Sequence, residues 1–169
     1  MPSQVCSFSL GMLRSFPQED SILKIKPVFA ETIDKSYPWG FFDGSAAEDS
    51  SACGAGGILY FSDKLSFSFK ASLGAGTNNI VELCALKLLL TLVRMKDYAR
   101  IQIFGDSQLV INWAKGKFRM HNLELSLILQ EVHRLSDCFE LVQFQRIYRE
   151  RNSLADTLAK DGVRISEGY

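Results

Sequence analysis

The spacing of hydrophobic and polar residues in the first half of the chain predicts three strands. Residues 40–45 and 56–61 are short runs rich in aromatic and aliphatic side chains, joined by a connection with Gly, Ser and Asp, as in a β-hairpin. From 65 to 71 apolar residues alternate with Ser or Lys, and this period of two indicates a half-buried strand. Together the three runs predict an antiparallel meander.

Helical patterns separated by two further strands follow. The cap-forming residues 77–79 precede an apolar run that reaches Val93 with almost no polar face, which predicts a helix buried on several sides. The remaining predicted elements are strands over 100–105 and 139–147 and helices over 107–115, 123–135 and 152–161, the last with Gly162 as its stop.

This order of elements predicts an α/β fold with a five-stranded mixed sheet flanked by helices. Two parallel, helix-connected strands would extend the meander from its first strand. Residues 1–37 mix charge, Ser and Pro without a sustained period, so we interpret them as a leader or linker before a domain at 38–165, with a tail at 166–169. Ligands of such sheets usually lie beyond the carboxyl ends of the parallel strands.

Composition narrows the classes of function. The chain has 169 residues, 47% of them hydrophobic, which suits one core. Lys plus Arg (19) equals Asp plus Glu (19), so nucleic-acid binding would need local basic patches or metal ions. The four scattered cysteines, Cys6, Cys53, Cys84 and Cys138, form no zinc motif, and we expect buried thiols.

The sequence shows no membrane span and no secretion signal. The longest apolar run, 83–93, is too short to cross a bilayer. The first sixteen residues lack a basic start and a compact hydrophobic block. We therefore expect a nuclear or cytoplasmic setting.

Four acidic residues occupy the strand ends and helix starts where this sheet would form a site: Asp43, Glu82, Asp106 and Asp156. Each has an ordinary alternative. Asp43 precedes a glycine, as in a turn, and Asp106 precedes a helix, as an N-cap does. Glu82 and Asp156 stand three residues after Asn79 and Ser153, where a capping box would place an acid.

The four acids together point to a metal site. Carboxylates that converge raise one another's proton affinity, so such a cluster is costly unless cations occupy it. A ligand set of oxygen atoms without Cys or His favours Mg²⁺, or Mn²⁺ in its place, over zinc.

Longer strings around these acids resemble the type 1 ribonuclease H family. The strings, in family order over about residues 40–163, are FDGS at 42–45, TNNIVEL at 77–83, GDSQLVIN at 105–112 and YRERNSLADTLAK at 148–160. The run at 148–156 and the GAGG strand at 54–57 resemble most the plant reverse-transcriptase-like domains of non-LTR retroelement polymerases. These glycines lead into a strand, so close backbone packing explains them better than a phosphate loop.

The resemblance implies a two-metal hydrolysis of the RNA strand in RNA–DNA hybrids. Asp43 would bridge both ions, Glu82 and Asp106 would complete one ion site and Asp156 the other. Water would be the nucleophile, leaving a 5′ phosphate and a 3′ hydroxyl. The resemblance also implies a monomer that is fused to, or derived from, a reverse transcriptase.

A set of substrate contacts follows from the same resemblance. Asn78, Asn79 and Gln108 match family positions that read the minor groove and the RNA 2′ hydroxyls. Helix capping by the two asparagines and a solvated helix face for Gln108 are the alternatives. The residues expected to contact substrate are Gly44, Ser45, Asn78, Asn79, Ser107, Gln108, Arg146, Arg149 and Asn152.

Two departures from the family bear on activity. Many members carry a proton-handling His ten residues before the last acid, where this chain has Arg146, so we expect slower catalysis that Arg146→His would speed. The basic segment after Asp106 is short and offers only a patch of Trp113, Lys115, Lys117, Phe118 and Arg119, which the end of a helix explains slightly better. A second basic surface near the site could contact phosphates and consists of Arg146, Arg149, Arg151, Lys160 and Arg164. The alternative to an active enzyme is a weak or inactive nucleic-acid-binding domain derived from a retroelement.

Overall fold

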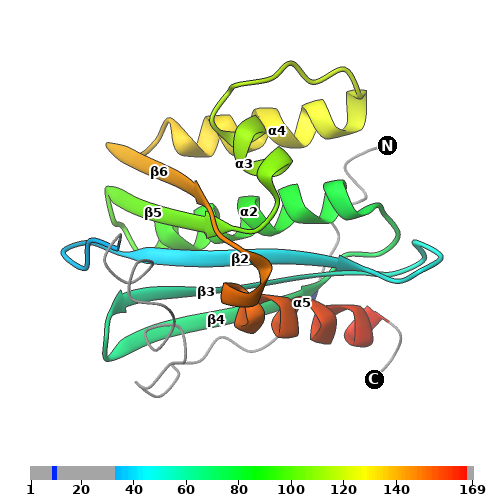
Figure 1. Ribbon diagram of the computed structural model, residues 1–169, viewed down its shortest axis with the longest axis horizontal. Coiled ribbons are helices and arrows are strands. Elements are labelled where there is room, and N and C mark those ends of the chain that lie inside the picture. The colour runs from blue at the N-terminus through cyan, green and yellow to red at the C-terminus, as the bar shows by residue number, and fades with distance from the viewer. Residues whose placement is uncertain (1–8, 11–32, 167–169) are drawn as a thin grey trace.

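The computed structural model describes residues 9–10 and 33–166, which form one sheet with helices on both faces (Figure 1). The sheet has the strand order β1-β4-β3-β2-β5-β6. Its strands are β1 (Ser9–Leu10), β2 (Trp39–Ala46), β3 (Cys53–Ser62), β4 (Leu65–Ser72), β5 (Arg100–Gly105) and β6 (Leu141–Arg146). The helices are α2 (Asn78–Met95), α3 (Gln108–Ala114), α4 (Leu123–Ser136) and α5 (Ser153–Ser166), with a 3-10 turn, η3 (Arg149–Arg151), before α5.

The pairing of the five long strands confirms the predicted mixed sheet. Strands β2, β3 and β4 pair antiparallel as a meander, while β5 pairs parallel with β2 and β6 parallel with β5. The two-residue strand β1 adds to the far edge of β4 and was not expected, because two residues are too short to show a period. It lies within the stretch that we interpreted as a leader or linker.

Two hydrophobic clusters lie on opposite faces of the sheet. Helix α2 packs on one face with α3 and α4, and its fully buried side chains include Leu83, Leu86 and Leu89. This confirms a helix that is apolar almost all round, because the sheet covers one side and α4 another. The smaller cluster on the other face includes Phe41 and lies under α5.

Helix α5 lies directly against the backbone of β3. A Cβ atom at Gly56 would come within 2.6 Å of Leu158 in α5, which confirms close backbone packing as the reason for the glycines of this strand. The predicted helix stop at Gly162 is wrong, since α5 continues to Ser166. Gly162 is needed for contact instead, because a Cβ there would come 2.9 Å from the Cα of Gly54.

The residues just before β2 also contact the sheet. The side chain of Gln102, in β5, donates to the carbonyl of Asp34 at 2.6 Å and accepts from the Asp34 amide at 3.0 Å. The hydroxyl of Tyr37 donates to Gln143 Oε1 at 3.0 Å, and Ile33 is buried. Residues 33–37 thus pack on the domain.

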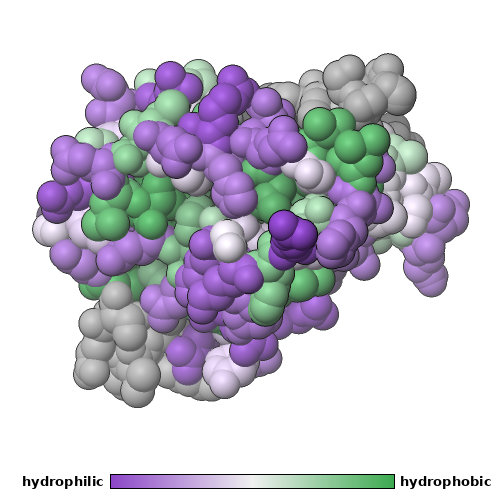
Figure 2. All heavy atoms as spheres, turned by 90° about the horizontal axis from the view of Figure 1, so that it is seen from above, coloured by the Kyte–Doolittle hydropathy of each residue, from purple (hydrophilic) through white to green (hydrophobic). Residues whose placement is uncertain are grey.

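The surface over α3 and α4 is mixed in character. Figure 2 shows separate hydrophobic patches among hydrophilic side chains on the face that lies at the top of Figure 1. Phe118, which lies between α3 and α4, and Leu123 and Leu127, which lie in α4, have exposed side chains.

The cysteines only partly match the expectation of buried thiols. Cys53 and Cys84 are buried, as expected, whereas Cys138 is exposed, so the expectation is wrong for Cys138. Cys6 lies outside the described residues.

None of the helices in the described residues combines the length and the hydrophobicity that crossing a bilayer requires.

Candidate metal centre

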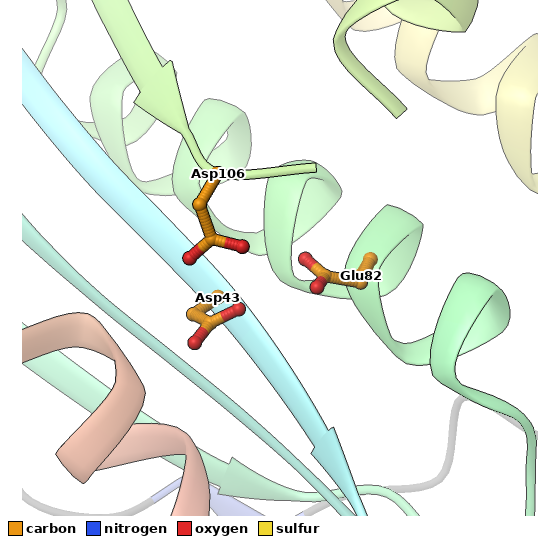
Figure 3. A group of neighbouring side chains, drawn as sticks. All are labelled: Asp43, Glu82 and Asp106. Carbon is orange, nitrogen blue, oxygen red and sulfur yellow. The ribbon is translucent and has the colours of Figure 1, made fainter. Parts of the chain in front are cut away.

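Three carboxylates from three separate elements converge at the carboxyl ends of β2 and β5. Asp43 lies in β2, Glu82 in α2, and Asp106 directly after β5. One oxygen atom of each lies within 4.8 Å of the others, and Figure 3 shows the three side chains pointing toward one another. Asp43 is only 5% exposed. This confirms the predicted convergence for three of the four acids.

Strand pairing and one glycine explain why these acids meet. The parallel register of β2 and β5 places Phe41 beside Phe104. Asp43 and Asp106 each follow two residues later, so both lie at the carboxyl-terminal side of this pairing. Gly105 lies against the ring of Phe42, where a Cβ atom would come 2.6 Å from the ring carbons. Glycine at this position lets β5 end close to β2.

The ordinary explanations for these three acids do not fit the structure. The N-cap of α2 is Thr77, whose hydroxyl accepts from the Ile80 amide, so Glu82 lies beyond the first turn and closes no capping box. The N-cap of α3 is Ser107 rather than Asp106. Asp43 is paired within β2, opposite Gly56, and not in a turn.

Asp156 lies in the first turn of α5, beside the same hollow but outside the group of three. Ser153 is the first residue of the helix, so it does not occupy the cap position that a capping box with Asp156 needs. The Asp156 carboxylate pairs with Lys160 one turn later, with 3.0 Å between Oδ2 and Nζ. The ammonium group therefore offsets the charge of Asp156.

Burial and mutual repulsion raise the proton affinity of two of the carboxyls. Burial, and next the charge of Asp106, raise the pKa of Asp43 to about 7. Burial, and next the charges of Asp43 and Asp106, raise the pKa of Glu82 to about 10. Ionising the whole group at neutral pH is therefore unfavourable unless a cation lies among the carboxylates.

The carboxylates line a hollow of about 460 Å³ that opens to solvent. The expected substrate contacts that line it are Gly44, Ser45, Asn78, Asn79, Ser107 and Arg149. Ala46 and Lys160 also line it; Lys160 belongs to the basic surface expected near the site, whereas Ala46 was not expected. Ala46 has no functional group on its side chain, so no signal in the sequence could have identified it.

Three of the expected substrate contacts lie elsewhere. Gln108 donates to Asn112 Oδ1 on its own helix. The guanidinium group of Arg146 lies over the ring of Tyr148, 4.7 Å from its centre, and Arg146 does not line the hollow. Asn152 is only 1% exposed and does not line the hollow.

The residues of the aromatic-basic patch after Asp106 do not form one surface in the structure. Trp113 is 7% exposed and belongs to the core, whereas Phe118 is exposed. Gly116 follows α3 with a φ of +76°, the left-handed conformation that ends many helices. The end of a helix therefore explains this segment, as the sequence slightly favoured.

The donor set fits a hard divalent cation. Asp43, Glu82 and Asp106 offer only carboxylate oxygens, which suit Mg²⁺ or Mn²⁺. In the described residues, the side-chain atom Glu82 Oε2 is buried without a hydrogen-bond partner, and such an atom costs free energy unless a ligand binds it. A cation among the three oxygens would satisfy it and relieve the repulsion.

Known proteins share this fold. The bifunctional protein Rv2228c of Mycobacterium tuberculosis is 24% identical over 123 residues, which are 72% of this chain and 34% of that protein. The solved N-terminal RNase H domain of Rv2228c superposes with a TM-score of 0.74 at 22% identity, covering 78% of this chain and 96% of that one. This chain thus spans about a third of the length of the curated relatives that it matches.

Two other solved structures show the same arrangement. RNase H1 from the archaeon Halobacterium salinarum has a TM-score of 0.72 at 24% identity, covering 77% of this chain and 99% of that one. LC11-RNase H1, solved in complex with an RNA/DNA hybrid, has a TM-score of 0.71 at 20% identity, covering 76% and 98%. The fold is therefore ribonuclease H-like. The family model described as reverse transcriptase-like matches residues 41–162, and the chain belongs to this reverse transcriptase-like family.

Proposed function

We propose that this chain is a ribonuclease H, an endonuclease that hydrolyses the RNA strand of RNA–DNA hybrids with the help of divalent cations. The observation that carries the proposal is the convergence of Asp43, Glu82 and Asp106 to within 4.8 Å in an open hollow. The ribonuclease H-like fold supports it, as does the hybrid bound by LC11-RNase H1.

The four acids of the hollow would hold two ions. Asp43, Glu82 and Asp106 would hold one Mg²⁺ ion, and Asp43 with Asp156 would hold a second one. When bound, such ions lower the pKa of a coordinated water and offset negative charge on a phosphate. The proposed products carry a 5′ phosphate and a 3′ hydroxyl.

Other residues around the hollow are suited to bind a nucleic-acid backbone. Arg149 and Lys160 add positive charge beside the carboxylates, where phosphate oxygens of the substrate would lie. Asn78 and Asn79, in the first turn of α2, line the same hollow and can exchange hydrogen bonds with a ribose 2′ hydroxyl. We propose that these asparagines distinguish RNA from DNA.

A cleavage assay with purified protein tests the function. A hybrid duplex with labelled RNA is incubated with Mg²⁺, with EDTA, and with Mg²⁺ and the Asp43→Asn variant. We expect cleavage of the RNA strand only with wild-type protein and Mg²⁺, with 5′ phosphate ends. Binding of the hybrid without any cleavage would favour the inactive, retroelement-derived domain instead.

Two further proposals concern the link to a reverse transcriptase and the oligomeric state of the chain. We propose that the chain is fused to, or derived from, a reverse transcriptase, which the family match supports. We also propose that it acts as a monomer, which light scattering during size-exclusion chromatography tests. The relatives from Mycobacterium tuberculosis and Halobacterium salinarum are not plant proteins, so closeness to plant retroelements stays a prediction.

A further inference from the structure

One buried side chain, Asn152, joins the segments that carry the acids. Its amide nitrogen Nδ2 lies 2.9 Å from the carbonyl oxygen of Phe42, the residue before Asp43. The same nitrogen lies 2.9 Å from Oδ2 of Asp106. Both partners are acceptors only, so the amide must present its NH₂ group to them, one proton to each.

The backbone of Asn152 fixes the fourth acid. The carbonyl oxygen of Asn152 accepts a 3.0 Å hydrogen bond from the Asp156 amide, the first such bond of α5. Asn152 therefore contacts β2 beside Asp43, binds the Asp106 carboxylate, and begins the helix that carries Asp156. No hydrogen bond to another of the described residues is found for its Oδ1 atom, which is buried.

Asparagine fits this position better than other side chains of similar size. A carboxylate would face two acceptors and repel Asp106, while an apolar side chain would leave the Phe42 carbonyl and Asp106 without a donor. Leaving Oδ1 buried without a partner costs free energy. The cost of the unpartnered Oδ1 atom calls for an explanation, and the positions that the Nδ2 group fixes for Phe42 and Asp106 provide one.

We propose that Asn152 is a positioning residue, which orients Asp106 toward Asp43 and sets the start of α5 so that Asp156 faces the same ions. This proposal rests on the proposed function, because it concerns the ion sites of that function. It places Asn152 behind the carboxylates, out of contact with substrate. It predicts that Asn152 controls ion affinity rather than hybrid binding.

The test measures ion binding without substrate, by titrating the metal-free protein with Mn²⁺ and following the unbound ion by electron paramagnetic resonance. For Asn152→Ala we expect affinity about 10- to 100-fold weaker, the usual cost of removing a partner of a metal ligand. Asn152→Ser provides a second variant, because Ser still caps a helix well while its single hydroxyl cannot serve both acceptors. We expect the same direction of change for Ser.

The matched control is Gln102→Ala. Gln102 is also a buried amide, 3% exposed, but its hydrogen bonds go to Asp34 and Tyr37, away from the carboxylates. We expect the control to lose thermal stability while keeping its Mn²⁺ affinity. A merely structural role for Asn152 would make the two variants alike, and this result would overturn the proposal.

Steady-state cleavage separates this proposal from the proposed function. For Asn152→Ala at limiting Mg²⁺ we expect kcat to fall with little change in KM for the hybrid. Wild-type protein that binds ions but cleaves no hybrid would overturn the proposed function and leave the ion titrations to decide the role of Asn152. Wild-type protein that binds no divalent ion would overturn both.

Discussion

Gly44 and Glu82 lie so close together that a Cβ atom at residue 44 would come 2.8 Å from the backbone nitrogen of Glu82. This contact sets how closely α2 approaches β2, and hence the distance between the carboxylates of Glu82 and Asp43. Sequence reasoning placed Gly44 among the substrate contacts. The structure gives it a packing role as well.

Replacing Gly44 by alanine is expected to push α2 away from β2. We expect the free energy of unfolding to fall by about 1–3 kcal/mol, as is usual for overpacking, and Mn²⁺ affinity to weaken. Denaturant unfolding and ion titration measure the two effects. Gly76→Ala is the control, because a Cβ atom there would make only ordinary contacts, the nearest at 3.4 Å from Cys53 Sγ. Equal ion affinity in the two variants would contradict the role assigned to Gly44.

The raised pKa of Asp43 predicts how stability depends on pH in metal-free protein. The pKa is about 7 in the folded chain and 3.8 ordinarily, so between these values the folded state binds more protons than the unfolded state. The contribution of Asp43 to stability therefore falls as pH rises from about 4 to about 7 and is constant above, while Glu82, with a pKa of about 10, lets stability keep falling at higher pH. Thermal unfolding in EDTA across this range, compared with Asp43→Asn, should show a steeper fall for wild type. Identical slopes in the two proteins would argue against a buried, proton-binding Asp43.

The same carboxyls should release protons when an ion binds. At pH 7 Glu82, whose pKa burial raises to about 10, and part of the Asp43 population hold protons that a cation must displace. Calorimetric titration with Mn²⁺ in buffers of different ionisation enthalpy should show this release, and ion affinity should increase with pH. An affinity that does not change between pH 6 and 8 would refute this account of the site.

Arg149, and not Arg146, is expected to supply the positive charge for the substrate. Arg149 lines the hollow, and its charge lowers the pKa of Glu82 against the larger effects that raise it, whereas Arg146 lies over Tyr148. We expect Arg149→Ala to weaken hybrid binding and to reduce the dependence of log affinity on log salt by about one. Arg146→Ala is the matched control and should leave this slope unchanged. Binding is measured in the Asp43→Asn background, which keeps the hybrid intact; equal slopes for the two arginine variants would count against this assignment.

The placement of Arg146 also changes the expectation for Arg146→His. Sequence comparison suggested that an imidazole there would speed turnover. Because the side chain at 146 lies outside the hollow, we now expect little gain from this substitution alone. Turnover of the variant on the hybrid measures the difference, and a marked increase would show that residue 146 reaches the reacting groups.

Asp156 is expected to govern the second ion only. It lines the hollow but lies outside the group formed by the other three acids. We expect Asp156→Asn to reduce the number of bound Mn²⁺ ions from two to one, with the tighter ion kept. Asp161→Asn is the control on the same helix, since Asp161 pairs with Lys70 at 3.6 Å and does not line the hollow. Loss of both ions in Asp156→Asn, or of neither, would exclude the proposed division of ligands.

Local patterns in the sequence were sufficient to predict most of the fold. The alternation over 65–71 predicted the strand but not its buried face, since Ser66 and Ser68 are buried and Leu65 is exposed. The apolar run before Val93 is a short-range signal that survives folding, because nearly the whole helix is buried. Gly162 misled for the opposite reason. A glycine near the end of a helical pattern usually signals a stop, but here it lies against Gly54, a contact that no local pattern shows.

The convergence of three of the four acids was predictable from the sequence, whereas the side chain that supports them was not. The acids stand at strand ends and helix starts, which family strings and topology identify together. Asn152 was assigned to the substrate on the family resemblance alone, whereas its hydrogen bonds reach residues 110 and 46 positions away. Only the folded sheet brings these partners together, so its burial could not be inferred from its neighbours in the sequence.

The most direct test of the central claim is the rate at which purified wild-type chain and Asp43→Asn cleave the RNA strand of a hybrid as Mg²⁺ is titrated. We predict cleavage that rises with Mg²⁺ for wild type, is abolished by EDTA, and is undetectable for Asp43→Asn. Cleavage that persists in EDTA, or that Asp43→Asn retains, would contradict a metal-dependent site built on these carboxylates. So would wild-type protein that leaves the hybrid intact at every Mg²⁺ concentration.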